Sequence, residues 1–211
     1  MEENFNNLNS STILFGNGDL PTHPLTKNII KNAKTIICVD GGANKLVKFD
    51  RKPDYIIGDL DSLSNEHDFT DCKTIKLPNQ SKNDLEKTLD WCLENQYNKV
   101  TLIGFSGLRD DHNLASLLLL KTYAKKISLT IITNYSTIHC KNGKNYFDSK
   151  IGQIISIIAL NRHTKISTEG LKYKIEKNRF SSPGNGISNV ATSTKIMIES
   201  NDWVWIFLNH I

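Results

Sequence analysis

Up to about residue 134, short apolar runs alternate with segments of helical period. The strand-like runs cover residues 11–15, 35–39, 55–58, 74–77, 99–103 and 128–133. Candidate helices lie between several of them, at residues 25–33, 83–95 and 111–125. Asn83 or Asp84 stands where the second helix needs a cap. Such alternation favours a doubly wound sheet. The sequence therefore predicts an α/β domain with a mostly parallel doubly wound sheet over residues 1–135.

The pattern changes after residue 135, where short apolar runs are separated by turn residues and no helical stretch of useful length occurs. Asn142-Gly143, between two strand-like segments, is a good hairpin signal. Many short strands with frequent turns are typical of a small sandwich or barrel. We therefore expect an all-β, sandwich-like domain over residues 136–211.

The formal net charge of +4 is unevenly distributed. Residues 1–135 carry 16 Lys and Arg against 17 Asp and Glu, whereas residues 136–211 carry 10 against 5. The basic residues of the second half are scattered rather than clustered, which favours a solvated surface over a polyanion-binding face. We therefore expect no nucleic-acid partner.

Apolar runs and cysteine spacing indicate the compartment. The longest apolar runs, at 154–160 and 203–208, are far shorter than the roughly 20 residues that cross a bilayer. The N-terminal segment is polar and shows no secretory signal. The four cysteines are spaced too widely for a zinc knuckle or a close redox pair, so free thiols in a reducing compartment are expected. The sequence thus predicts a cytoplasmic protein without a membrane partner.

Acidic and glycine-bearing segments follow several of the strand-like runs, at residues 40–44, 59–62, 83–84 and 104–111. In an open parallel sheet, ligands bind beyond the carboxyl ends of the strands. Carboxylates gathered there repel one another unless a cation is present, and Mg²⁺ takes oxygen ligands together with substrate phosphates. Asp59, Asp61 and Asp84 fit that role, with Arg109 placed to grip phosphate oxygens.

Each acidic residue also has an ordinary structural interpretation. Asp40 fits a simple turn, Asp59 or Asp61 a cap for the following segment, and Asp84 the cap of its own helix. The coincidence of four such loops at one predicted edge favours a binding site. Neither a GxxxxGK[ST] loop nor a GxGxxG motif occurs, so a nucleotide is expected to be held through metal and arginine.

Six sequence blocks occur in a characteristic order: "CVDGGAN", "PDYIIGDLDS", "LPNQSKNDLEK", "GFSGLRDDH", "TEGLKY" and "GISN". In order and spacing they resemble the thiamine pyrophosphokinase family, from about residue 12 to the C-terminus. The resemblance implies an enzyme that transfers the pyrophosphoryl group of ATP to thiamine, with Mg²⁺, giving thiamine diphosphate and AMP. It also implies a catalytic ATP- and Mg²⁺-binding domain over residues 1–135, a thiamine-binding β-sandwich over 136–211, and a homodimer whose active sites lie between subunits.

The resemblance implies roles for individual residues. The implied metal ligands are Asp59, Asp61 and Asp84. The implied catalytic residues are Asp59, Asp61, Asp84, Arg109 and Asp111; those near ATP are Asp40, Lys87, Arg109 and His112; those near thiamine are Gln80, Tyr173, Ser188 and Asn189. We hypothesise that one further aspartate, Asp111 or Asp40, orients the thiamine hydroxyl or accepts its proton. His112 is otherwise expected simply to start a helix.

The chain departs from the family pattern at three positions. Leu108 stands where the family commonly has glycine, and Asn83 replaces a frequent threonine. Tyr173 occupies the place of an aromatic, often tryptophan, that stacks on thiamine; without the resemblance, its ring would be assigned to the β core. No departure removes a carboxylate, so we expect an active enzyme.

Two other functions fit parts of the sequence. A Mg²⁺-dependent phosphatase with an aspartyl nucleophile also carries a D-x-D site, but it needs that motif after its first strand, whereas "GDLDS" follows the third run here. A non-enzymatic RNA-binding module would account for the basic second half and predicts steeply salt-dependent affinity for oligonucleotides. The absence of a basic cluster with interleaved aromatics argues against it.

Overall fold

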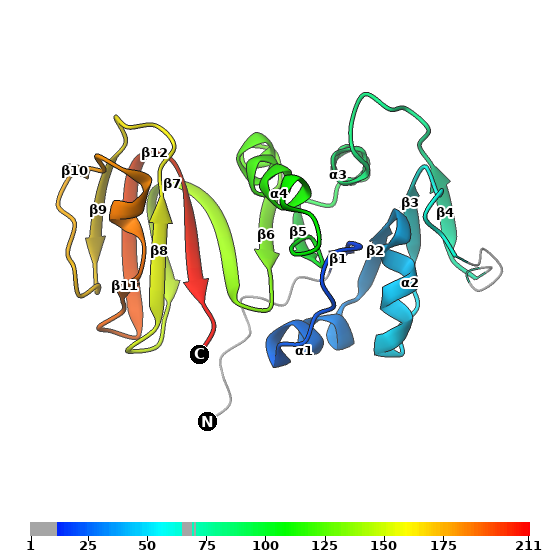
Figure 1. Ribbon diagram of the computed structural model, residues 1–211, viewed down its shortest axis with the longest axis horizontal. Helices are drawn as coiled ribbons and strands as arrows, with labels where there is room; N and C mark the ends of the chain where they lie inside the picture. The colour runs from blue at the N-terminus through cyan, green and yellow to red at the C-terminus, as the bar shows by residue number, and fades with distance from the viewer. Residues whose placement is uncertain (1–11, 65–68, 70) are drawn as a thin grey trace. The chain divides into compact units, whose positions relative to one another are not determined.

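The computed structural model describes residues 12–64, 69 and 71–211. The chain divides into two compact units, with Asn134 ending the first and Tyr135 beginning the second. Helices and strands alternate in the first unit, whereas the second is rich in strands (Figure 1), and each unit has its own apolar core.

The first unit contains a parallel sheet with the strand order β4-β3-β2-β1-β5-β6. Its strands are β1 (Thr12–Phe15), β2 (Thr35–Val39), β3 (Tyr55–Gly58), β4 (Lys73–Lys76), β5 (Lys99–Ile103) and β6 (Ser128–Ile132). The order reverses between β1 and β5, which makes the sheet doubly wound. The predicted fold class is therefore confirmed, and each predicted strand of this unit lies within one residue of its expected bounds.

The helices of the first unit are α1 (Pro24–Asn32), α2 (Ala43–Leu46), α3 (Asp84–Glu94) and α4 (Asp110–Tyr123). Helices α1 and α2 lie on one face of the sheet, and α3 and α4 on the other (Figure 1). The cap of α3 is Asn83, whose side chain accepts a hydrogen bond from the Glu86 amide at 2.8 Å. The sequence pattern missed α2 and the 3-10 turns beside it, η2 (Asp40–Gly42) and η3 (Val47–Phe49).

The second unit is antiparallel and is organised by its last strand. Its elements are β7 (Ser136–Asp148), β8 (Ile154–Ile158), β9 (Lys165–Glu169), β10 (Asn178–Arg179), η5 (Pro183–Gly186), β11 (Asn189–Val190) and β12 (Lys195–Asn209). β12 pairs with β7 along most of its length, with β9 through its first half and with β8 through its second half. β12 therefore passes from one group of strands to another, and apolar side chains of β8, β9 and β12 form one core.

The hairpin predicted at Asn142-Gly143 is wrong. Both residues lie inside the continuous strand β7. Gly143 pairs with Ser200, at the edge of an irregularity in the register between Ser200 and Val204 of β12. Its φ of +69° lies in the left-handed region that glycine adopts without strain. The glycine thus allows β7 to bend opposite the irregularity of β12, and the strand continues instead of reversing.

No helix among the described residues is long and apolar enough to span a membrane.

His139 gives the second unit a pH-dependent stability. Its ring lies 5.3 Å from that of Phe147, and burial, assisted by Lys141, lowers the pKa of His139 from 6.5 to about 4. Between these pH values the unfolded state binds more protons, so the unfolding free energy falls as pH falls from 6.5 to 4. Full protonation below the folded pKa corresponds to about 3 kcal/mol, at about 1.36 kcal/mol per pKa unit.

We therefore expect His139→Leu to reduce the acid-induced loss of stability by an amount of that order. Urea unfolding of both proteins at intervals from pH 7.5 to pH 4 measures it. Above pH 7 the two proteins should differ by a constant amount. Parallel stability curves across the whole range would contradict the expectation.

Candidate active site

Three carboxylates meet at the carboxyl ends of β2 and β3. Asp40 directly follows β2, and Asp59 and Asp61 follow β3. Each offers an oxygen that lies within 4.8 Å of oxygens from the other two. We call these three residues the acid cluster. The sequence predicted all three at this edge of the sheet, with Asp59 and Asp61 as metal ligands and Asp40 near the nucleotide.

Asp40 is held in an unusual position by its neighbours. Its φ is +43°, a conformation that non-glycine residues seldom adopt and that aspartate tolerates better than most. Gly58 leaves room for it, because a Cβ at Gly58 would lie 2.9 Å from the Cβ of Asp40. One carboxylate oxygen of Asp40, Oδ1, is buried and accepts no hydrogen bond. A buried acceptor beside two further carboxylates fits a cation ligand, so the residues present suit Mg²⁺.

Asp59 and Asp61 belong to one tight turn, in which Leu60 has a φ of +70°. The Asp61 amide donates to Asp59 Oδ1 at 3.4 Å, and the Gln80 amide nitrogen donates to Asp59 Oδ2 at 3.3 Å. The Gln80 hydrogen bond is the largest cause of a lowered Asp59 pKa, with further contributions from Asp61 and Lys87. Asp59 therefore presents an ionised carboxylate at neutral pH. Gln80, predicted to bind thiamine, lies beside the acid cluster.

Asp84 and Lys87 form an ion pair at the start of α3. The Lys87 ammonium donates to Asp84 Oδ1 at 2.8 Å and to the Leu77 carbonyl at 3.1 Å, and only 7% of Lys87 is exposed. Among the described residues, Asp84 is not a member of the acid cluster. Its role as a metal ligand stays a prediction. Lys87 places a buried positive charge where it lowers the pKa of Asp59, and its role toward phosphates stays a prediction.

Arg109 and Asp111 lie at the start of α4. The Arg109 guanidinium donates to both carboxylate oxygens of Asp111, at 3.1 and 2.6 Å, and the His112 amide donates to the same carboxylate at 2.9 Å. The hydrogen bond from Arg109 is the largest cause that lowers the pKa of Asp111 to about 2. Leu108, at the position where the family commonly has glycine, has a φ of +62°. That left-handed conformation explains why glycine suits the position.

Arg109→Met is expected to raise the pKa of Asp111 from about 2 toward its ordinary value of 3.8. The reason is that the methionine removes both the hydrogen bonds and the positive charge that favour the ionised form. Carboxyl carbon NMR of the titrating protein measures the change. Lys121→Met, a substitution near the other end of α4, serves as the control. An unchanged Asp111 titration in Arg109→Met would contradict the pairing.

The loop after β1 was not recognised in the sequence as part of this edge. Its backbone is joined to the last residue of β5 and to the loop after it by three hydrogen bonds: Gly16 N to Ile103 O at 2.9 Å, Gly18 N to Gly104 O at 2.6 Å and Asp19 N to Ser106 O at 2.7 Å. These bonds join the two loops at the point where the strand order reverses. Two glycines spaced by one residue, directly after the first apolar run, were the available signal.

In the second unit, Asn189 holds the backbone of Tyr173. The buried Asn189 side chain accepts from the Tyr173 amide at 3.0 Å and donates to the Tyr173 carbonyl at 2.7 Å. Tyr173 is 62% exposed and so lies outside the core. Ser188 has a φ of +61°, and its amide donates to the Ser156 hydroxyl at 3.1 Å. The structure thus brings together three residues predicted to bind thiamine.

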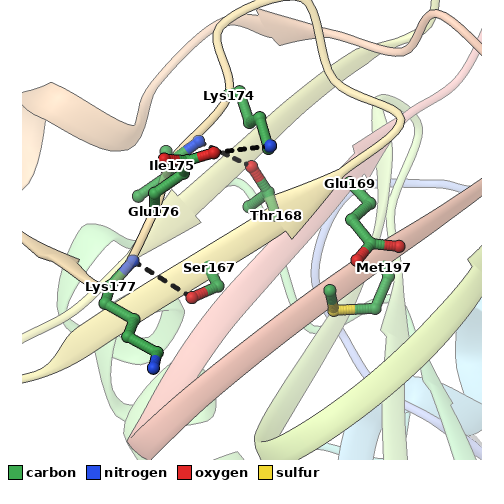
Figure 2. A pocket seen from close by; sticks show the side chains of 8 residues that line it. All are labelled: Ser167, Thr168, Glu169, Lys174, Ile175, Glu176, Lys177 and Met197. Atoms are coloured by element: carbon green, nitrogen blue, oxygen red, sulfur yellow. Dashed lines mark hydrogen bonds and ion pairs between the residues drawn. The ribbon is translucent and has the colours of Figure 1, made fainter.

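A separate pocket of about 460 Å³ lies in the second unit, between β9 and the segment that follows Tyr173 (Figure 2). The segment is fixed to β9 by side-chain hydroxyls: Thr168 Oγ1 accepts from the Ile175 amide at 3.0 Å, and Ser167 Oγ accepts from the Lys177 amide at 3.1 Å. Ser167, Thr168, Glu169, Lys174, Ile175, Glu176, Lys177 and Met197 line the pocket. No predicted site residue is among them.

Comparison with protein families matches both units. Residues 26–132 match "Thiamin pyrophosphokinase, catalytic domain", and residues 137–207 match "Thiamin pyrophosphokinase, substrate-binding domain". The chain belongs to the thiamin pyrophosphokinase family. Thiamin pyrophosphokinase 1 of Caenorhabditis elegans is 27% identical over 194 residues, covering 83% of this chain and 79% of that protein.

Solved structures of this family share the fold. The thiamin pyrophosphokinase from Candida albicans superposes with a TM-score of 0.83 at 21% identity, covering 95% of this chain and 88% of that one. The enzyme from Bacillus subtilis gives a TM-score of 0.81 at 20% identity, covering 95% of this chain and 99% of that one. The similarity therefore spans both units.

Proposed function

We propose that the chain transfers the pyrophosphoryl group of ATP to thiamine, giving thiamine diphosphate and AMP. The observation that carries the proposal is the acid cluster with its buried, unpaired Asp40 oxygen, in a chain that matches both domains of the family. Neither the phosphatase nor the RNA-binding module is supported by the comparisons.

In this reaction the thiamine hydroxyl attacks the β-phosphorus of ATP, and the bond from that phosphorus to the α-phosphate bridging oxygen breaks. The hydroxyl loses its proton, and AMP leaves with the electron pair of the broken bond. Positioning and charge neutralisation supply most of the catalysis in phosphoryl transfer. Mg²⁺, bound to phosphate oxygens, would supply charge stabilisation and a template. Asp59 and Asp61 would hold it, together with Asp84 or Asp40.

Basic side chains that follow strands of the parallel sheet would bind the triphosphate. Lys87 is a buried ammonium with a fixed direction, because Asp84 and the Leu77 carbonyl hold it. Arg109 is exposed and bound only to Asp111 among the ion pairs of the described residues. A phosphate would therefore compete with Asp111 for the guanidinium, and both Arg109 and Asp111 would face the reacting groups.

The choice of proton acceptor between Asp111 and Asp40 follows from their surroundings. With a pKa of about 2, Asp111 is a weak base and is better suited to orient the thiamine hydroxyl through a hydrogen bond. Release of Arg109 to phosphate would raise that pKa and strengthen Asp111 as a base. We therefore assign Asp111 to the thiamine hydroxyl and Asp40 to the cation.

Thiamine would bind against the second unit. Its flat, positively charged ring suits the Tyr173 side chain, where a cation–aromatic contact contributes about 0.5–2 kcal/mol. The Lys172 ammonium lies 5.5 Å from the centroid of the same ring, so thiamine would take the other face or displace it. Asn189 would act by holding the Tyr173 backbone. Ser188, which precedes Asn189 in the chain, would contribute its hydroxyl. We also propose that the protein is a cytoplasmic homodimer whose active sites lie between subunits, with the catalytic unit of one subunit facing the thiamine-binding unit of the other.

Incubation of the pure protein with ATP, Mg²⁺ and thiamine, followed by chromatography, tests the proposal. We expect thiamine diphosphate and AMP in equal amounts, with AMP release dependent on thiamine. Phosphate release without thiamine would indicate a phosphatase instead. Failure to form thiamine diphosphate at all would refute the proposed function.

A further inference from the structure

The segment after β2 contacts the loops on both of its sides. It begins with Asp40 of the acid cluster and continues through Gly41 and Gly42 into helix α2. Two consecutive residues of α2, Asn44 and Lys45, direct their side chains to different loops. Neither residue was assigned a role from the sequence.

Lys45 binds the loop after β1. Its ammonium donates to the carbonyls of Asn17 and Gly18, at 2.7 and 2.5 Å. The same loop is hydrogen-bonded to the loop after β5, which leads into Arg109. Lys45 therefore fixes the position of two paired loops through one ammonium group.

Asn44 binds the turn after β3. Its amide nitrogen donates to the Ser62 carbonyl at 2.8 Å, and its side-chain oxygen accepts from the Ser64 amide at 3.2 Å. This turn carries Asp59 and Asp61. Both hydrogen-bonding groups of the Asn44 side chain are thus used on the turn that bears two of the three carboxylates.

The two loops come close together at Gly41. A Cβ at Gly41 would lie 2.7 Å from the Asn17 side-chain nitrogen and 3.0 Å from the Ser62 Cβ. The loop held by Lys45 and the turn held by Asn44 therefore border the same residue, next to Asp40. This places the Asn17 amide beside the acid cluster.

We propose that Asn44 and Lys45 are positioning residues that hold the two loops on either side of Asp40 in the conformation that binds ATP. The inference rests on the proposed function. A loop that is already ordered loses less conformational freedom when ligand binds, so loosening it weakens binding. Once the nucleotide is bound and the loops are ordered, the chemical step should proceed almost as before. Loss of either side chain should therefore raise the KM for ATP with little change in kcat.

Lys45→Met tests the first half of the proposal. We expect faster amide hydrogen exchange in residues 16–19. The KM for ATP and the Kd for α,β-methylene-ATP with Mg²⁺ should each rise about 10-fold, while kcat stays within about 2-fold of that of the unaltered protein. Lys45→Arg should restore most of the affinity, because the guanidinium also reaches carbonyl oxygens. Lys48→Met, in the same segment but exposed, should change none of these quantities.

Asn44→Ala tests the part of the proposal that concerns the turn after β3. If Lys45→Met does not fold, this variant tests the inference by itself. Faster exchange should then be confined to residues 59–64, and the affinity for α,β-methylene-ATP with Mg²⁺ should again fall several-fold. Faster exchange with unchanged nucleotide affinity would mean that both residues only stabilise the loops and do not affect ATP binding. Unchanged exchange would mean that neither side chain orders its loop. Either result overturns the inference. If the unaltered protein forms no thiamine diphosphate, the proposed function fails, while exchange and analogue binding still decide this inference.

Discussion

Asp61→Asn is expected to lower the rate of thiamine-dependent AMP release by about 10³-fold, equivalent to about 4 kcal/mol of transition-state stabilisation. The reason is that the amide keeps the shape of the side chain but removes a negative charge from the acid cluster. The neighbouring Asp59 and Asp40 would still offer oxygens, but the cation would be held more weakly and less well oriented. Steady-state kinetics at several Mg²⁺ concentrations measure the loss.

The fold should survive this substitution, because Asp61 is exposed and its carboxylate accepts a hydrogen bond from the neighbouring Ser62 hydroxyl, which an amide oxygen can also accept. Thermal unfolding of the variant should therefore match that of the unaltered protein. Asp71→Asn, which removes an exposed carboxylate paired with Lys52, is the matched control and should retain full activity. Activity unchanged in Asp61→Asn would remove this residue from the cation site and leave the proposed reaction standing.

Gly42→Ala is expected to reduce both stability and activity. Gly42 has φ −57° and ψ −31°, a conformation that alanine adopts readily, so the backbone itself does not oppose the substitution. The added Cβ would instead lie 2.3 Å from the Phe15 carbonyl oxygen and 3.0 Å from the Gly16 carbonyl carbon. Because both atoms belong to the backbone, neither can rotate away. The segment after β2 must therefore move away from β1, and Asp40 moves with it.

Overpacking of this kind costs about 1–3 kcal/mol, and a contact between backbone atoms should fall at the upper end. We expect a melting temperature lowered by roughly 10 °C and a clear loss of kcat. Gly184→Ala is the control, since its Cβ would approach only the Ser182 hydroxyl, at 3.7 Å. A Gly42→Ala protein with the melting temperature and activity of the unaltered one would show that this close approach of the backbones is not required.

The sequence predicted the sheet of the first unit closely because all its strands except the edge strand β4 are largely buried. Strands such as β1 and β5 are therefore almost uniformly apolar and stand out between polar segments. Helix α2 was missed because it is short and two glycines precede it, which lowers local helix propensity. The hairpin at Asn142-Gly143 was predicted wrongly because a glycine with positive φ has the same sequence signature at a turn and opposite a bulge.

The acidic residues of the site could be predicted because strand ends in a parallel sheet converge, so position in the sequence indicates position in space. The contacts of Lys45 could not be predicted, because its ammonium binds backbone carbonyls. Every residue has such a carbonyl, so the side chains in the sequence do not indicate which ones are bound. The ion pair between Asp84 and Lys87 was equally hidden. Both residues were assigned to the site, but their three-residue spacing on a helix also permits the direct contact that the structure shows.

The central place of β12 has a consequence for biosynthesis. All strands of the first unit precede residue 133. In the second unit β7, β8 and β9 all pair with β12, and the ribosome synthesises β12, residues 195–209, last of the strands. A nascent chain can therefore complete the parallel sheet early, while the second unit waits with unpaired strand edges until β12 emerges. That interval is when the chain is most exposed to misassociation with its neighbours on a polysome.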